Sequence, residues 1–408
     1  MNIVKISTYF LFFSYIWFFV ESGSYVSLLK LFSVFVFAFA LLIGLRNVFK
    51  KRLIPKMKTW VFLFFFNLLG SITSLYSEDP KGSLVVLFGL NLYFLIFHLC
   101  GYRFSLSKEK LVEFNGILIK ISLLLVTYAL GSNPALTLSQ FHTLFIDRIR
   151  VYGTFVHPNE LGITSFVSLI ACFINLKLYS KRKYKVFMLL AMAYFFTCMI
   201  LSDSRGALYS FLLFLGVYYL LAFMKQLSSK YEKFIPPLVM LLVAVCYAFM
   251  HRGIFTDEQA IGKFSTGRLG NWKVVWDYFI TNDPYHFLFG YGLNGVDKLQ
   301  AMGFYTDNGY LVWMYEAGLF NTILVLLVLI NLLRKNILSK SFNTFGVAIF
   351  CSYMVYTTIE NLLTSFGILA SFYCWLVMYT ALFEHKVHIN KKRVKQKEVI
   401  AETKSKSA

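Results

Sequence analysis

Long apolar runs, separated by short clusters of basic residues, restrict most strongly what this chain can fold into. A helix needs about 20 apolar residues to cross the hydrocarbon part of a bilayer, and such runs fill most of the 408-residue sequence. We expect spans that begin near residues 4, 26, 59, 83, 112, 161, 185, 206, 234, 309, 342 and 364. The predicted fold is an all-α, polytopic integral membrane bundle of about 12 transmembrane helices.

Composition supports this fold class over a soluble one. The chain is 58% hydrophobic and 15% charged, whereas an average soluble domain is about 25% charged. A net charge of +20 could indicate nucleic-acid binding, but that reading requires basic residues mixed with polar surface on one face. Here the basic clusters, such as LRNVFKKRLIPKMK and SKRKYK, lie between apolar runs, so we expect no nucleic-acid partner.

The charge distribution predicts the topology. Lys and Arg concentrate in alternate loops (46–58, 103–110, 181–185, 225–233 and 334–340) and in the C-terminal tail, whereas ESGSY, SEDPKG and ENLLT contain few. By the positive-inside rule, both termini are cytoplasmic in a multi-pass cell-membrane protein. The first run ends in FFVESGSY without an obvious small-residue cleavage site, which favours a retained span over a signal peptide.

The domain prediction is a membrane domain over residues 1–384 and a basic cytoplasmic tail over 385–408. Two extracytoplasmic segments are longer than simple connectors: 131–160 and, before the tenth span, 251–308. Long ordered loops often carry function. The six cysteines lie in or beside apolar runs without ligand-like spacing, so we expect neither a metal site nor disulfides.

The first outer segment, IDRIRVYGTFVHPNELGIT, leads directly into a predicted span. Pro158 and Asn159 stand where a helix begins, and Arg148, Arg150 and His157 lie just before it. Free backbone N–H groups combined with positive charge make this helix start a candidate anion site. Alternatively, Arg150 anchors the loop to lipid headgroups and His157 only packs a turn.

A very tight outer hairpin, LSDSRGALYS, connects the seventh and eighth predicted spans. It puts Arg205 at a helix start, on the side where the positive-inside bias disfavours arginine. The planar guanidinium group can bind a phosphate through two hydrogen bonds, so Arg205 is a candidate phosphate ligand. An ion pair with Asp203 is the alternative.

The longer segment contains STGRLGNWKVVWDYFITNDPYHFLFGYGLNG. An apolar, aromatic-rich stripe at helical spacing predicts an amphipathic helix on the membrane surface (Trp272, Val275, Trp276 and Phe279), and such a face more often packs than binds a ligand. Arg268, just before it, is another candidate phosphate ligand. The glycines of FGYGLNG could let the backbone approach a ligand closely.

The motif TDNGYLVWMYEAGLF opens the tenth span from the outside. It places Asp307 and Asn308 at the water boundary and Glu316 about two turns deeper, where an ionisable residue is a functional candidate. Alternatively, Asp307 is the N-cap of the helix and Glu316 is a structural partner for an arginine. Lys30 and Lys120 also fall within apolar runs, but lysine can snorkel to the interface, so neither is assigned a role.

In order and spacing, these motifs resemble the O-antigen ligase and polymerase superfamily, the Wzy-type integral-membrane glycosyltransferases. The resemblance follows RVYGTFVHPNELG, SDSRGA, GRLGNW, LFGYG and DNGYLVWMYEAGL over residues 148–320, and the other spans are similar only in being hydrophobic. It implies transfer of a glycan from a polyprenyl diphosphate carrier to an acceptor hydroxyl outside the cytoplasmic membrane. It implies no metal, cofactor or nucleotide sugar.

The resemblance also implies roles for particular residues: Arg150, Arg205 and Arg268 hold the diphosphate, supported by Asn159, Asn308 and Glu316. Ligases of the family carry a histidine and an Asn-like residue, followed by a glycine after about nine further residues. Here Asp307 and Asn308 stand at that pair, with Gly318 at the expected distance. The missing histidine favours a polymerase over a ligase and leaves Asp307 or His157 as the catalytic base.

The predicted function is therefore polymerisation of lipid-linked oligosaccharide repeat units into capsular, exopolysaccharide or O-antigen chains. Flippase and chain-length regulator proteins are expected partners. One alternative is a ligase that moves finished glycan to a lipid or wall acceptor, and another is a polysaccharide or lipid-linked oligosaccharide transporter. A transporter should show inverted repeats and charged or helix-breaking residues at the bilayer midplane, whereas this chain puts its arginines and Asp307 at the outer boundary.

Overall fold

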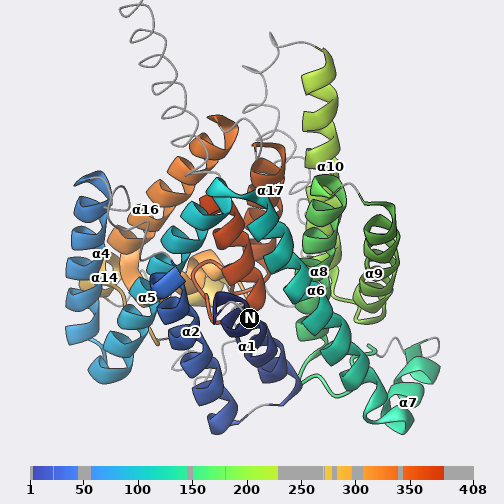
Figure 1. The fold of residues 1–408 in the computed structure, drawn as a ribbon. Helices are drawn as coiled ribbons and strands as arrows, with labels where there is room; N and C mark the ends of the chain where they lie inside the picture. Colours follow the sequence, from blue (N-terminus) through green and yellow to red (C-terminus); the bar gives the residue numbers. More distant parts are fainter. Residues whose placement is uncertain are drawn as a thin grey trace, which may run out of the picture.

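The computed structural model describes residues 3–21, 23–44, 57–144, 150–179, 181–227, 270, 272–277, 283–295, 307–338 and 343–380, and this part of the chain is all-helical (Figure 1). Its labelled helices are α1 (Ile3–Val20), α2 (Ser24–Gly44), α4 (Met57–Leu75), α5 (Pro80–Leu106), α6 (Lys108–Gly131), α7 (Pro134–Leu144), α8 (Pro158–Leu178), α9 (Arg182–Leu201), α10 (Arg205–Leu227), α14 (Pro284–Phe289), α16 (Gly309–Leu338) and α17 (Asn343–Ile359). A further helix, Leu369–Thr380, follows α17.

Eight of the described helices are long and apolar enough to cross a membrane, and they begin at residues 3, 25, 80, 108, 158, 182, 205 and 309. Each start lies within four residues of a predicted span. The spans expected near 59, 342 and 364 correspond to the shorter apolar helices Val61–Leu75, Thr344–Ile359 and Leu369–Thr380. The span near 234 lies outside the described residues, so the polytopic membrane fold is confirmed and the count of twelve stays a prediction.

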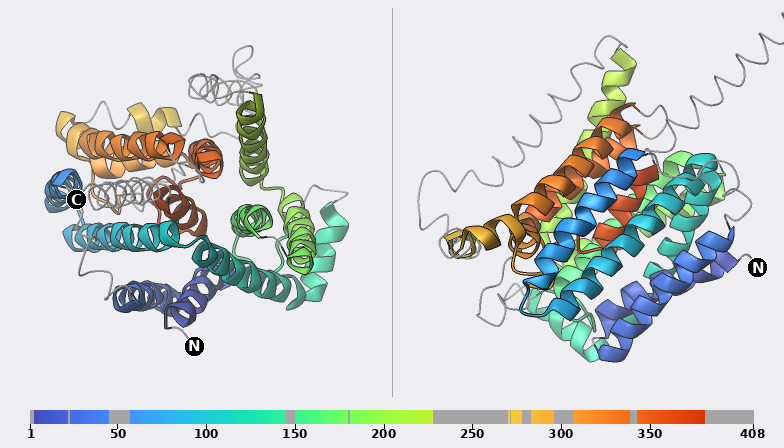
Figure 2. Two further views of the ribbon diagram at one scale, coloured as in Figure 1. Left: turned by 45° about the horizontal axis from the view of Figure 1, so that its top comes forward. Right: turned by 90° about the vertical axis from the view of Figure 1, so that its left-hand side faces the viewer.

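The helices run side by side as one bundle (Figure 2). In Figure 1, α4, α5, α14 and α16 lie on the left and α8, α9 and α10 on the right, with α17 between them. Helix α8 and Leu369–Thr380 are the most enclosed, and Trp375 and Tyr373 have no exposed surface. Large apolar side chains instead point outward from α2 and α9, as Phe32 and Leu190 do, which is the arrangement expected of helices that face lipid.

Four of the described helices begin at a proline that directly follows a capping side chain, and before α7 the capping side chain is Asn133, which accepts from the Leu136 N–H. Asp79 accepts from the Gly82 N–H before α5, and Asp283 accepts from the Tyr285 N–H before α14. His157 does the same before α8. Proline suits the first helical position because its missing N–H would be unsatisfied there in any case, so these starts follow from the local sequence.

The chain between α17 and Leu369–Thr380 runs through the bundle as irregular backbone over residues 360–368. Unsatisfied carbonyls are costly away from water, so such backbone must find partners within the protein. Its carbonyls accept hydrogen bonds from the side chains of Tyr15, Lys30, Tyr353 and Trp375. Lys30, which was assigned no role from the sequence, thus donates to the Gly367 carbonyl, and its ammonium lies 3.5 Å from the centre of the Phe18 ring.

Helix α16 is broken at Gly318, which has a φ of 76°. A Cβ at Gly318 would lie 2.4 Å from the Leu288 carbonyl oxygen, and one at Gly290 would lie 2.2 Å from the Glu316 carbonyl oxygen. Only glycine permits so close a backbone approach at these dihedral angles. Gly290 of FGYGLNG therefore packs against α16, while the close approach of Gly292 is to Ser77. That these glycines let the backbone approach a ligand stays a prediction.

Hydrogen bonds across this contact satisfy two carbonyls at the break. The N–H groups of Tyr291 and Gly292 donate to the carbonyls of Tyr315 and Glu316 over 2.9 and 3.0 Å. The same turn is tied to the α4–α5 hairpin, because the Leu293 N–H donates to Ser83 Oγ over 2.9 Å. These hydrogen bonds thus connect α16, at its break, to the segment 289–293.

The predicted amphipathic helix is present over residues 272–277, while Phe279 lies outside the described residues. Val275 is 2% exposed and packs with Tyr315, and Trp276 is 42% exposed. This stripe therefore packs partly on α16, as the structural interpretation predicts, and its contact with a membrane surface stays a prediction.

Candidate functional site

The start of α8 lies against the end of α17. Asn159 Nδ2 donates a hydrogen bond to Glu360 Oε1 over 2.9 Å, although the two residues are 201 positions apart. The start of α10 reaches the same place, since a Cβ at Gly206 would lie 3.1 Å from both Ile359 and Tyr356. Glycine at this position lets α10 begin close to the last turn of α17.

Helix α16 also begins beside α17. A Cβ at Gly309 would lie 2.8 Å from Thr357 Cγ2 and 2.9 Å from the Leu363 backbone nitrogen. Three helix N-termini, those of α8, α10 and α16, therefore gather around the end of α17. Each N-terminus carries a partial positive charge and has N–H groups without an intrahelical partner, so this end of the bundle favours anions.

The segment before α8 is held by backbone hydrogen bonds to several other elements. Its N–H groups donate to the Leu201 and Ala129 carbonyls, to Gln140 Oε1 and to the Phe19 carbonyl, over 2.8 to 3.0 Å (donors Val151, Tyr152, Gly153, Thr154 and Val156). The segment therefore has a fixed path from Arg150 to His157. Helix α7, which the sequence analysis did not anticipate, precedes this path within the predicted segment 131–160, and Arg148 lies outside the described residues.

Arg150 and Asn159 form a short polar chain that continues to Glu360. Arg150 Nη1 donates to Asn159 Oδ1 over 3.3 Å, and the amide of Asn159 donates in turn to Glu360. The guanidinium is thereby oriented by the first turn of α8. This contact fixes the position of Arg150 independently of any ligand that its other N–H groups bind.

His157 is the N-cap of α8. Its Nδ1 accepts from the Asn159 N–H over 3.1 Å, and Glu160 completes a capping box by accepting from the His157 N–H over 3.1 Å. Because Nδ1 is an acceptor, the neutral ring carries its proton on Nε2. His157 can therefore donate a hydrogen bond from Nε2, but it has no free ring nitrogen with which to act as a base.

The charges around His157 reveal which groups lie near it. Partial burial, followed by the Arg150 guanidinium, lowers the pKa of His157 from its ordinary value of 6.5, while Asp307 acts in the opposite direction. Asp307 therefore lies within electrostatic range of His157. Burial and the Arg150 charge favour the neutral ring, and together they outweigh the opposite effect of Asp307.

The N-cap of α16 is Asn308, not Asp307. Asn308 Oδ1 accepts from the N–H groups of Tyr310 and Leu311 over 3.0 and 3.2 Å. The alternative in which Asp307 serves as the cap is therefore wrong. Asp307 lies one residue before the cap, at the end of the bundle where the three helix N-termini gather.

Arg205 opens α10 immediately after a tight turn, as predicted. The turn is so short that Asp203 adopts a left-handed conformation with φ of 45°. Arg205 Nε lies 3.8 Å from Asp203 Oδ1, and both side chains are about half exposed. This is the ion pair that the sequence left as an alternative, and at such exposure a pair of this kind contributes little to stability.

One comparison with known proteins bears on these residues: positions 189–326 match the family model described as O-antigen ligase. This stretch belongs to the O-antigen ligase family. The resemblance recognised in the motifs is thereby confirmed. No curated protein matches the chain.

The O-antigen ligase match runs from α9 into α16 and includes Arg205, Asp307 and Asn308. Arg150, His157 and Asn159 precede it, yet the fold brings them to the same end of the bundle. Membership of this family indicates a membrane enzyme that transfers glycans. The gathered helix starts are the candidate active site of that enzyme.

Two further predicted residues are not placed in this group by the structure. Glu316 is buried in α16 beside the break at Gly318, and its carbonyl accepts from Gly292. The structure thus gives its backbone a structural contact and leaves its predicted role as a proposal. Arg268 lies outside the described residues.

Glu360 is a site residue that the sequence reasoning missed. It appeared only as the first letter of the short outer loop ENLLT. The signal in the sequence was an acidic residue at the outer end of an apolar run, directly before a short connecting loop. Its contact with Asn159 comes from tertiary structure alone.

Proposed function

We propose that this protein is an extracytoplasmic glycosyltransferase that polymerises polyprenyl-diphosphate-linked oligosaccharide repeat units into capsular, exopolysaccharide or O-antigen chains. The observation that supports the proposal is that His157, at the start of α8, interacts electrostatically with both Arg150 and Asp307, while Arg150 bonds to Asn159 of the same helix start. A cation, a neutral donor and a carboxylate are the groups that displacement of a diphosphate by a sugar hydroxyl requires.

In the proposed reaction, a hydroxyl of the acceptor glycan attacks the anomeric carbon of the donor. Asp307 accepts the hydroxyl proton as the new carbon–oxygen bond forms and the bond to the diphosphate oxygen breaks. Between the two bases that the sequence left open, the cap geometry favours Asp307, because the His157 Nδ1 already accepts a hydrogen bond.

The leaving diphosphate carries the electron pair of the broken bond. Arg150 and Arg205, together with Arg268, would bind its oxygens, and the N-termini of α8, α10 and α16 favour the same charge. The Nε2–H of His157 can donate to a phosphate or sugar oxygen. In this arrangement Asn159 and Asn308 are positioning residues, because one orients Arg150 and the other caps α16 next to Asp307.

The ligase is the second candidate, because the family model that matches is described as O-antigen ligase. It would use the same groups on the donor side and differ in the acceptor. The charge distribution supports both candidates equally, since it predicts cytoplasmic termini and therefore an extracytoplasmic site.

The two are separated by the glycans of cells in which the native gene is replaced by an Asp307→Asn variant, with membrane protein levels checked. Loss of a polymerase leaves single repeat units on the lipid carrier. Loss of a ligase leaves long chains that stay on the carrier. Wild-type chains at normal protein levels would exclude Asp307 from the reaction.

A further inference from the structure

A second polar cluster lies at the end of the bundle opposite the candidate site. It lines a pocket between α1, α2, α5 and α6 that contains Lys5, Arg103, Lys110 and Glu113. Helix α1 fixes the separation of the two ends, because Phe19 at its far end bonds to the segment before α8, whereas Lys5 lies in its first turn.

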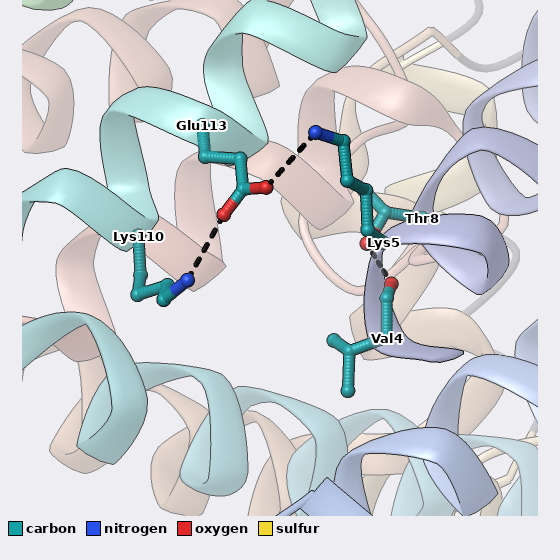
Figure 3. A network of polar contacts seen from close by, with 5 residues as sticks. All are labelled: Val4, Lys5, Thr8, Lys110 and Glu113. Carbon is teal, nitrogen blue, oxygen red and sulfur yellow. Dashed lines mark hydrogen bonds and ion pairs between the residues drawn. The ribbon is translucent and has the colours of Figure 1, made fainter. Parts of the chain in front are cut away.

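In this pocket, one carboxylate forms ion pairs with two lysine ammonium groups (Figure 3). Lys5 Nζ lies 3.3 Å from Glu113 Oε1, and Lys110 Nζ lies 3.2 Å from Glu113 Oε2. Arg103 adds a third cation to the same lining. Three cations around one carboxylate leave an excess charge of about +2, which an anion would complement.

The depth of the cluster identifies the kind of anion. Lys5 and Lys110 lie at the beginnings of the spans Ile3–Val20 and Lys108–Gly131, and Arg103 lies near the end of Pro80–Ser105. All three cations therefore stand where a helix leaves the apolar layer, at the level of lipid headgroups. Both lysine side chains are 41% exposed, so a ligand can reach them.

Apart from Thr8, the rest of the lining is apolar and includes Phe37 and Leu41 of α2 and Phe104 of α5. A free phosphate has no apolar part to contact that surface, whereas a phospholipid would place its phosphate among the cations and an acyl chain against the aromatic rings. Basic pockets between spans on the positively charged side commonly bind acidic lipid headgroups.

We propose that this pocket is a binding site for an anionic phospholipid, with Lys5, Arg103 and Lys110 as the headgroup ligands. Glu113 keeps the two lysines directed into the pocket while the lipid is absent. The site is separate from the candidate active site and does not depend on the proposed reaction.

The test is native mass spectrometry of the full-length protein titrated with phosphatidylglycerol, and with phosphatidylcholine for comparison. A Lys5→Gln/Lys110→Gln variant should bind phosphatidylglycerol about 25-fold more weakly, since each cation near a membrane surface contributes about a fivefold effect. A Lys181→Gln/Lys183→Gln variant removes two exposed cations from the same end of the bundle, outside the pocket, and should bind as the wild type does.

A Lys5→Arg/Lys110→Arg variant should retain binding, which guards against loss through misfolding of the glutamine variant. Equal weakening in the Lys181/Lys183 control, or equal affinity for phosphatidylcholine, would overturn the proposal. So would displacement of the lipid by millimolar inorganic phosphate, which would make the pocket a free phosphate site.

Discussion

The two ends of the bundle both gather charged side chains, but they hold them differently. At the candidate active site, His157 and Asn308 cap helices, and Arg150 is tied through Asn159 to Glu360. At the opposite end, long lysine side chains share one carboxylate near the surface. The first arrangement fixes atoms to the backbone, as a reaction requires, whereas the second supplies charge, as a headgroup requires.

The largest difference between the two ends should appear when a cation is changed. Arg205→Ala should lower glycan transfer about 10²- to 10³-fold, the usual cost of removing one group that stabilises developing negative charge. Arg205→Lys should recover part of that loss. Activity is measured on membranes with equal protein content.

Asp203→Asn is the matched control, because Asp203 is the ion-pair partner of Arg205. It should keep most of the activity if Arg205 acts on the substrate. If it is as inactive as Arg205→Ala, then Arg205 serves only the ion pair and the turn.

Helix packing at the active-site end should be the next most sensitive feature. A Cβ at Gly162 of α8 would lie 2.3 Å from Ser204 Cβ, which precedes Arg205. Gly162→Ala should therefore push the α9–α10 turn away, lower stability by about 1–3 kcal/mol and reduce transfer. Thermal unfolding in detergent measures the first effect.

Gly216→Ala on α10 is the control, because no atom outside the local backbone lies within 4 Å of a Cβ there. It should leave both stability and transfer near wild type. An equally damaging Gly216→Ala would mean that helical glycines matter for a reason other than this close approach.

Two variants of His157 separate helix capping from chemistry. His157→Ala removes the cap and should cost about 1 kcal/mol of stability. His157→Asn keeps a capping acceptor but lacks the Nε2–H. We expect His157→Asn to unfold like the wild type yet to transfer glycan about tenfold or more slowly. Full activity in His157→Asn would make His157 a cap and nothing more.

A fall in pH should lower the stability of the folded protein through protonation of His157. The pKa of His157 is lowered in the folded protein, so as pH falls below about 6.5 the unfolded chain binds a proton first. The contribution of the neutral ring is complete above that pH and is lost as pH falls through the lowered pKa. His157→Asn should reduce the dependence of melting temperature on pH between 7 and 5; an unchanged dependence would assign it to other groups.

The smallest effect should come from the opposite end. Lys5→Gln breaks a half-exposed ion pair with Glu113, and pairs of that kind contribute about 0–1 kcal/mol. Melting temperature should change little, and polysaccharide chain length should not change. Shortened chains in this variant would show that the two ends are coupled.

Sequence reasoning predicted the membrane fold because span length and charge asymmetry are local properties. It also placed the tight turn before Arg205 and the helix start at Pro158, since capping and proline signals act over a few residues. It could not predict the contact between Asn159 and Glu360 or the role of Lys30. Both depend on how distant helices pack.

The same limit explains the interpretation of FGYGLNG. The sequence showed that Gly290 and Gly292 permit a close approach, but not to what. The structure supplies the partners, which are the break at Gly318 of α16 for Gly290 and Ser77, before α5, for Gly292. Asp307 could be separated from helix capping only once Asn308 was seen to accept the hydrogen bonds.

The most direct test of the central claim uses purified protein, a polyprenyl-diphosphate-linked repeat unit as the sole substrate, and gel analysis of the products. The wild-type protein should yield a ladder of lipid-linked chains of increasing length. Asp307→Asn should leave single repeat units, with the rate reduced about 10²- to 10⁴-fold by loss of the general base. A ladder of normal length and rate from Asp307→Asn would contradict the account.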